Sequence, residues 1–311
     1  MVSPSTSKAG VDAMQMIRPI TISQSNLTSN VALDDGAEYS AAATYALGTV
    51  VIDTASATPT YHAFESLVAA NVGNALTDSS KWLDLGNVNR LRMFDQSVGT
   101  LTTETSEIDV TVAATTVCNG LALFGLAAEQ VQVTVTNGGG TLYDETVSLR
   151  STFGITSWYA WFTQEVEYSS RLILTDLPPN SGTNVQVQIT GTGDVSCGTM
   201  VLGKLRDLGA GPSYGARGGI IDYSRKTTDD FGNTTLTERA FANRLTFRSM
   251  VPAGDVDGVF DILAAYRATP VVWIGATDYG MTSTYGWARD WGIEIAYPTN
   301  SILALEIEGL A

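Results

Sequence analysis

Residues that could carry acid–base or metal chemistry are few in this chain. There is one histidine, His62, in the alternating segment 60–64. The familiar zinc hydrolases hold their metal with two or three histidines, so a single histidine excludes those patterns. General acid–base and nucleophilic catalysis need His, Cys, Lys or paired carboxylates gathered in a pocket. We therefore expect His62 to be a half-exposed strand residue without a catalytic role.

Two pairs of carboxylates lie close in sequence, Glu104 with Glu107 and Glu165 with Glu167. If residues 165–167 form a strand, both of its carboxylates point to one face. A glycosidase uses two carboxylates about 5 to 9 Å apart, so a glycan-degrading enzyme stays open as an alternative. Same-face acidic pairs are also common on exposed strands that do no chemistry. We expect no enzymatic activity.

The segment 229–233 places oxygen-bearing side chains around Gly232. It lacks the full pattern of an EF-hand calcium loop. A polar hairpin turn is the favoured interpretation. No other motif implies a cofactor or metal, so we expect neither.

The two cysteines, Cys118 and Cys197, are each near an apolar, strand-like run. Neither has the C-x-x-C spacing of a metal or redox site. A disulfide is open if both ends of one sandwich meet, because distance along the chain does not decide it. Buried free thiols are the favoured expectation.

Composition excludes some classes of partner. The 311-residue chain has a net charge of −15, and only 16% of its residues are charged. Phosphate backbones and anionic membranes attract clustered Lys and Arg, so we expect neither nucleic-acid sequence recognition nor membrane insertion. Residues 1–10 are polar and do not resemble a signal peptide. No apolar run reaches the roughly 18 residues of a membrane-spanning helix.

Strand-like alternation dominates the chain. Apolar and polar residues alternate over 108–112, 131–135 and 185–189, and Gly-, Pro- and Asn-rich turn segments separate such runs. This pattern predicts a mainly β, multidomain fold. One segment, 256–268, instead predicts a helix, with Asp255 as its N-cap.

Four units are expected along the chain. They are an N-terminal arm (1–35), a small aromatic β module (36–88), a jelly-roll-like β-sandwich (89–203) and a mixed β unit with one α-helix (204–311). A short strand is expected inside the arm, over 17–22. The length of the chain is typical of two or three compact domains.

Aromatic residues mark the small module. Tyr45, Tyr61 and Trp82 are spread through small, polar sequence, and Gly48 stands where a tight turn would need it. A segment of this size is too small for an ordinary core. Its rings must form a miniature core, a surface platform, or both.

This pattern resembles the small chitin-binding carbohydrate modules of the family 5/12 type. The matching residues are Tyr45, Gly48, Val50, Val51, Tyr61, Asn71 and Trp82. The resemblance implies that Tyr45, Tyr61 and Trp82 bind carbohydrate, because sugar CH faces stack on exposed rings. The alternative is that these rings only hold the module together.

The sandwich is similar to galactose-binding-like, discoidin-type jelly rolls. The similarity lies in the apolar run 119–125 and in strands expected over 158–161 and 197–203. The module followed by such a sandwich resembles structural proteins of tailed bacteriophages.

The last hundred residues resemble the tail-tube-like half of phage tail-tip proteins. Strands are expected over 218–225, 240–250, 270–275, 285–287 and 303–309, around the helix at 256–268. In such folds a ring of copies closes the sheets into a barrel. Arg239, Arg244 and Arg248 are expected at a subunit interface or lumen, and a plain solvated face is the alternative.

The resemblance implies a structural component of a phage tail, at the distal tail, tail tip or baseplate. It would be made in the host cytoplasm and would end in the tail of the virion. Its partners would be copies of itself in a three- or six-fold ring, other tail proteins and, peripherally, bacterial surface glycan. A receptor-binding adhesin and a capsid decoration or connector protein stay open as alternatives.

Overall fold

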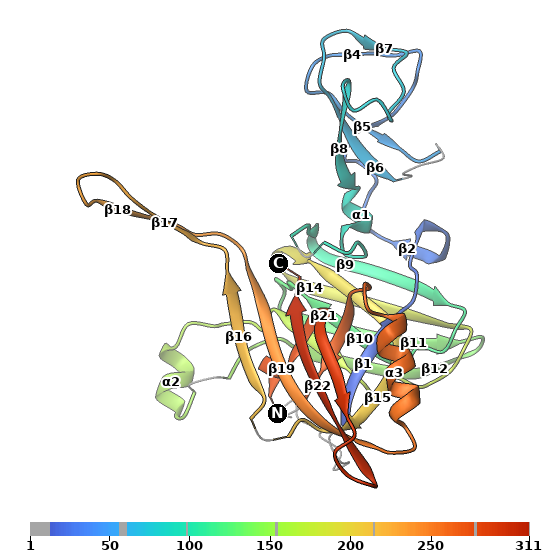
Figure 1. Ribbon diagram of the computed structural model, residues 1–311. Coiled ribbons are helices and arrows are strands. Elements are labelled where there is room, and N and C mark those ends of the chain that lie inside the picture. The colour runs from blue at the N-terminus through green and yellow to red at the C-terminus, as the bar shows by residue number, and fades with distance from the viewer. Residues whose placement is uncertain are drawn as a thin grey trace.

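The computed structural model describes residues 13–55, 61–97, 99–152, 155–213, 215–276 and 279–310. Strands dominate this part of the chain and form two large sheets and three small ones (Figure 1). Its α-helices are short: α1 (Asn89–Arg92), α2 (Trp158–Thr163) and α3 (Val256–Ala265). The predicted fold class is confirmed: the chain is mainly β and multidomain, with one α-helix, α3, in its C-terminal part.

A five-stranded antiparallel sheet has the order β12-β11-β14-β9-β2. Its strands are β2 (Leu27–Ser29), β9 (Thr102–Ala114), β11 (Gln130–Asn137), β12 (Gly140–Ser148) and β14 (Thr183–Cys197). The three alternating runs of the sequence fall inside β9, β11 and β14, and their apolar residues are buried. The period-2 pattern therefore predicted both the strands and the face that each one buries.

A nine-stranded sheet has the order β13-β10-β15-β1-β20-β21-β22-β19-β16. Its strands are β1 (Ala13–Pro19), β10 (Gly120–Phe124), β13 (Arg171–Leu174), β15 (Thr199–Ala210), β16 (Arg217–Asp222), β19 (Phe241–Pro252), β20 (Val271–Ile274), β21 (Ser283–Glu294) and β22 (Asn300–Gly309). All of its pairings are antiparallel.

The sandwich forms where the β10–β15 part of this sheet faces the five-stranded sheet. Leu121 and Leu123 of β10 enter the same core as the buried valines of β9, β11 and β14. Ala122, between them, points to the opposite face and packs with Ile17 and Tyr285. Alternate residues of β10 thus serve two cores, and this explains the nearly continuous apolar run of the sequence here.

The C-terminal half of the sheet curls around a second core. Leu245 and Phe247 of β19 pack there with Val259 and Leu263 of α3. The curl brings β19 close to β15. There the Ser249 hydroxyl donates a hydrogen bond to the carbonyl oxygen of Ala210. The predicted helix is therefore confirmed, and it covers one face of a strongly curved sheet.

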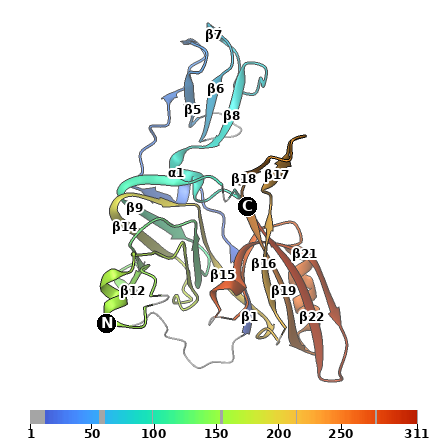
Figure 2. The same cartoon turned by 90° about the vertical axis from the view of Figure 1, so that its left-hand side faces the viewer.

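Residues 13–19 form a central strand, and the prediction of an N-terminal arm is wrong for them. β1 lies between β15 and β20, and Met14, Met16 and Ile17 are fully buried. Its position joins the sandwich to the C-terminal part of the same sheet (Figure 2). Long-range pairing decided this, and a short strand gives no local signal for its partners.

The boundary predicted at 203/204 falls inside β15, which serves both halves of the nine-stranded sheet. At that point β1 and β15 approach closely, because a Cβ on Gly203 would overlap the carbonyl oxygen of Arg18. Only glycine fits between backbones at that distance.

Two local predictions about the sandwich are wrong. Residues 158–161 begin the helix α2 and do not form a strand. The Ser157 side chain caps this helix by accepting a hydrogen bond from the Ala160 amide. Residues 197–203 are not one strand, since β14 ends at Cys197 and β15 begins at Thr199.

The small module has sheets of its own and lies above the sandwich (Figure 2), and Ile52 and Ala63 at its base join the sandwich core. It has a four-stranded sheet, β3-β5-β6-β8, and a two-stranded one, β4-β7. Its strands are β3 (Ala37–Glu38), β4 (Thr44–Tyr45), β5 (Val50–Asp53), β6 (His62–Ser66), β7 (Asn71–Val72) and β8 (Trp82–Asn87). Gly48 makes the predicted turn with a φ of 79°, which favours glycine.

Both cysteines are free and buried, as the favoured expectation had it. Burial raises the pKa of the Cys118 thiol, and raises that of the Cys197 thiol to about 12.

Since the thiolate is the reactive form, both cysteines should resist a thiol reagent at pH 8 in the native protein. We expect two thiols to react in denaturant without reductant. Fewer than two would show that a disulfide forms.

Candidate functional site

The exposed face of β19 carries two of the three arginines that the sequence singled out. Arg244 and Arg248 alternate with the buried Leu245 and Phe247. Arg244 makes an ion pair with Glu306 of β22, with 2.5 Å between Nη2 and Oε1. Beside it, Arg289 of β21 pairs with Glu308 at 3.6 Å. This face therefore mixes both signs of charge and is not a purely basic patch.

Arg248 lines a shallow hollow of about 260 Å³ on the same part of the sheet. The hollow also includes Glu294 and Ile302 from the neighbouring strands. Arg239 lies outside β19, where its backbone amide donates a hydrogen bond to the Ser224 side chain. The structure thus brings Arg244 and Arg248 onto one face and separates Arg239 from them.

Between β16 and β19 the chain makes a long excursion, the hairpin arm, here defined as residues 223–240. Its two strands, β17 (Arg225–Thr228) and β18 (Thr234–Thr237), pair only with each other among the described residues. Figure 1 shows the arm extending away from both large sheets. All eight strand residues are exposed.

The tip of the arm is the polar turn predicted over 229–233. The Asp229 carboxylate accepts hydrogen bonds from the Phe231 and Asn233 amides, and these bonds stabilise the turn. The arm nevertheless exposes large apolar side chains, since Phe231 is 91% and Leu236 is 72% exposed. Sequence reasoning recognised the turn and missed this apolar surface.

The nine-stranded sheet also has open edges. β16 has a neighbour only in β19, and β13 only in β10, within the described part of the chain. The other side of each edge strand leaves backbone N–H and C=O groups without a strand partner. The hairpin arm follows directly from the β16 edge, so the two features lie on the same side of the sheet.

The module's two main rings are in its interior. Tyr45 is 8% and Trp82 is 2% exposed, and both pack against Phe64 and Val51. Their ring centroids are 5.4 Å apart in an edge-to-face arrangement. The Trp82 indole N–H donates to the carbonyl oxygen of Asn74. The rings form the miniature core, and neither offers a face to a sugar in this conformation.

Tyr61 does not belong to that cluster. It is partly buried against the sandwich core, at the base of the module. The structure thus separates the three residues proposed for carbohydrate binding into two interior rings and one ring at the junction.

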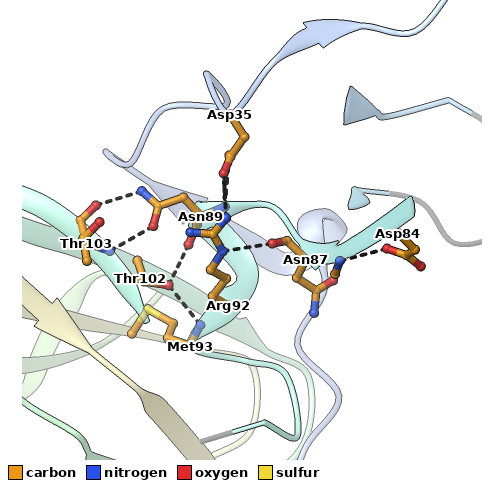
Figure 3. Close-up of polar contacts among 9 residues, drawn as sticks. Asp35, Asp84, Asn87, Asn89, Arg92, Met93, Thr102 and Thr103 are labelled. Carbon is orange, nitrogen blue, oxygen red and sulfur yellow. Dashed lines mark hydrogen bonds and ion pairs between the residues drawn. The ribbon is translucent and has the colours of Figure 1, made fainter. Parts of the chain in front are cut away.

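A polar junction fixes the module on the sandwich (Figure 3). The Asp35 carboxylate accepts hydrogen bonds from the Asn89 amide and from Arg92, the latter at 3.1 Å. Asn89 exchanges two hydrogen bonds with the backbone of Thr103 in β9. Arg92 also donates from Nε to the carbonyl oxygen of Asn87. These contacts tie Asp35 and Thr103, which are 54 and 14 residues from Asn89 in sequence, to α1.

Asp35→Ala should therefore loosen the junction. The Asp35 side chain is only 9% exposed, so its loss leaves the Asn89 amide without its side-chain acceptor and removes one of the two acceptors of Arg92. We expect a loss of about 1 to 3 kcal/mol in the free energy of unfolding, measured by denaturant titration. Hydrogen exchange at the Asn89 amide should also become faster. Asp34→Ala, one residue away and exposed, is the matched control; an equal effect of the control would contradict this account.

The candidate chemical residues do not converge. His62 pairs with Asp84 across neighbouring strands, with 2.9 Å between Nδ1 and Oδ1, on a partly exposed surface. Glu165 and Glu167 are exposed and lie outside any strand, so the same-face geometry does not arise. Among the described residues, no group of three His, Cys, Asp or Glu side chains could hold a metal ion. Within that same part of the chain, no helix is long and apolar enough to cross a membrane.

Helix α2 presents an exposed aromatic surface in a segment where a strand was expected. Trp158, Tyr159 and Phe162 are each more than 70% exposed. The Arg150 guanidinium lies over the Trp161 ring, 4.3 Å from its centroid. The resemblance to jelly rolls implied a strand here, whereas Trp158, Tyr159 and Phe162 face solvent on a short capped helix.

Comparisons of this chain with known proteins gave no match. No family model, curated protein or solved structure matches it.

Proposed function

We propose that this chain is a structural protein of a phage tail that assembles with copies of itself. The hairpin arm is the observation that carries the proposal. A two-stranded hairpin alone is marginally stable in water, and this one exposes Phe231 and Leu236. A neighbouring subunit would bury these side chains and stabilise the arm.

The sheet edges support the same proposal. An open edge strand such as β16 is a template for pairing with another chain unless it is covered. Closed rings cover every such edge, and symmetric closure is the rule among homo-oligomers. A three- or six-fold ring is the arrangement that the resemblance to tail-tube folds implies.

Charge distribution favours contact through the C-terminal part. Ten of the 17 Lys and Arg residues lie after residue 203, against 13 of the 32 Asp and Glu. Residues 1–203 therefore carry most of the net negative charge. Copies repel least where that charge is smallest, so the sandwich and the module would point outwards. Arg244 and Arg248 would lie at or near the subunit contact.

Labelling within a virion tests the assignment to a tail. An antibody against the small module, applied to particles that contain this chain, should decorate the tail or its tip in electron micrographs. Decoration of the capsid shell would instead support a decoration protein, and decoration at the head–tail joint would support a connector.

A further inference from the structure

A hollow of about 510 Å³ lies where the module meets the sandwich. Three segments contribute to it: the N-terminal turn, with Ser23 and Gln24; the module, with Tyr61 and Asn87; and the α1 region, with Leu91 and Phe94. Its volume is within the range of about 300 to 1,000 Å³ that is usual for small-molecule sites. No element alone could form it, so the sequence did not predict it.

Gln24, one of the residues that line this hollow, has an unsatisfied polar atom. Its side-chain oxygen Oε1 is buried and has no hydrogen-bond partner among the described residues. A buried acceptor without a donor carries an energetic cost. A ligand hydroxyl that donates to Gln24, after a small rotation of the side-chain amide, would recover that cost.

Tyr61 provides a second, independent observation. Its backbone φ is 61°, in the left-handed region that a bulky residue rarely adopts. The Tyr61 carbonyl oxygen accepts a hydrogen bond from the Val88 amide, which holds this conformation at the junction. Strained backbone of this kind is concentrated at binding sites, where the surrounding structure maintains it.

The chemistry of the wall selects the class of ligand. Tyr61 and Phe94 provide apolar rings, and Ser23, Gln24 and Asn87 provide side chains that can donate and accept hydrogen bonds. All the residues that line the hollow are uncharged. Rings suit the CH faces of a pyranose, and amides and hydroxyls suit its hydroxyl groups. An ionic ligand would find no counter-charge there.

We propose that this hollow binds one end of an uncharged saccharide. Recognition by the chain would then take place at the base of the module and not on its rings Tyr45 and Trp82. The site is complete within one chain, so it does not depend on the proposed assembly, and its test and that of the assembly can fail separately.

Calorimetric titration of the intact chain with neutral disaccharides (chitobiose, cellobiose, maltose and lactose) tests the proposal. We expect at least one of them to bind, with a dissociation constant of about 1 mM or tighter. Gln24→Leu should weaken that binding at least tenfold without lowering the melting temperature, because it removes the unsatisfied oxygen at nearly constant volume. Gln130→Leu, at an exposed position of the sandwich, should change nothing.

Tyr61→Gly is the second variant, because glycine adopts the same backbone conformation without strain and removes the ring. It should also weaken binding at least tenfold. Binding that survives both Gln24→Leu and Tyr61→Gly would place the sugar elsewhere and overturn the proposal. Failure of all four disaccharides to bind, or binding of charged saccharides alone, would overturn it as well.

Discussion

Replacing the hairpin arm, residues 223–240, by a two-residue Asn-Gly turn should convert an assembled protein into a folded monomer. Asp222 of β16 and Phe241 of β19 are a directly opposed pair, so a two-residue turn can close the shortened hairpin. The arm contributes none of its residues to the cores of the chain. We expect its removal to change the free energy of unfolding by less than about 1 kcal/mol.

Sedimentation velocity measures the outcome of this change. The variant should sediment as a monomer at concentrations where the unmodified chain is assembled. Phe231→Ser combined with Leu236→Ser should weaken assembly in the same direction, because these side chains are the apolar part of the arm.

The aromatic helix α2 offers a matched control for the arm. Trp158→Ser combined with Phe162→Ser removes equally exposed apolar side chains elsewhere. This variant should leave assembly unchanged. If it dissociated the oligomer and the arm deletion did not, α2 and not the arm would hold the subunits together.

Trp82→Ala is expected to unfold the small module. Trp82 is the largest side chain of a core that also contains Tyr45, Phe64 and Val51. Truncating a buried tryptophan costs about 3 to 5 kcal/mol, and a unit of this size has little stability to lose. We expect the near-ultraviolet circular dichroism of the module to be lost and hydrogen exchange over residues 37–55 and 61–87 to become fast.

The same variant separates two interpretations of the aromatic residues. If Trp82 were a surface platform for sugar, its loss would leave the module folded and abolish only sugar binding. Leu47→Ala, at a position in the module that is 66% exposed, is the control and should not destabilise it. A folded module in the Trp82→Ala protein would contradict a role for Trp82 as the centre of the module's core.

Much of the fold could be predicted because its signals are local. Alternation over 131–135 directly reflects a strand with one buried face, and β11 has that form. The helix at 256–265 followed from the spacing of Val256, Val259 and Leu263. The turns at Gly48 and at residues 229–233 could be predicted, because the residue types that favour a turn are adjacent in sequence.

The parts that failed depend on contacts distant in sequence. Nothing in residues 13–19 indicates that they pair with β15 and β20, about 190 and 255 residues away. A spaced set of rings likewise does not say which face is solvent, so the sequence left a platform and a core open for Tyr45 and Trp82, which form a core. The helix at 158–163 depended on one capping side chain, Ser157, against an aromatic composition that favours strands.

The candidate sites were predictable only in part. Arg244 and Arg248 lie on one exposed face, as strand alternation requires, but their acidic partners come from other strands. Tyr61 was singled out as a binding residue, and it lines a hollow whose other walls come from segments up to about 40 residues away. The orphaned oxygen of Gln24 is visible only in three dimensions.

The mass of the unmodified chain in solution tests the central claim of self-assembly most directly. Sedimentation equilibrium over a range of concentrations up to about 100 μM should give a species of three or six times 33.0 kDa. This mass should be reached at a definite stoichiometry, because a closed ring leaves no free edge for further addition. A mass of 33.0 kDa at every concentration would contradict it.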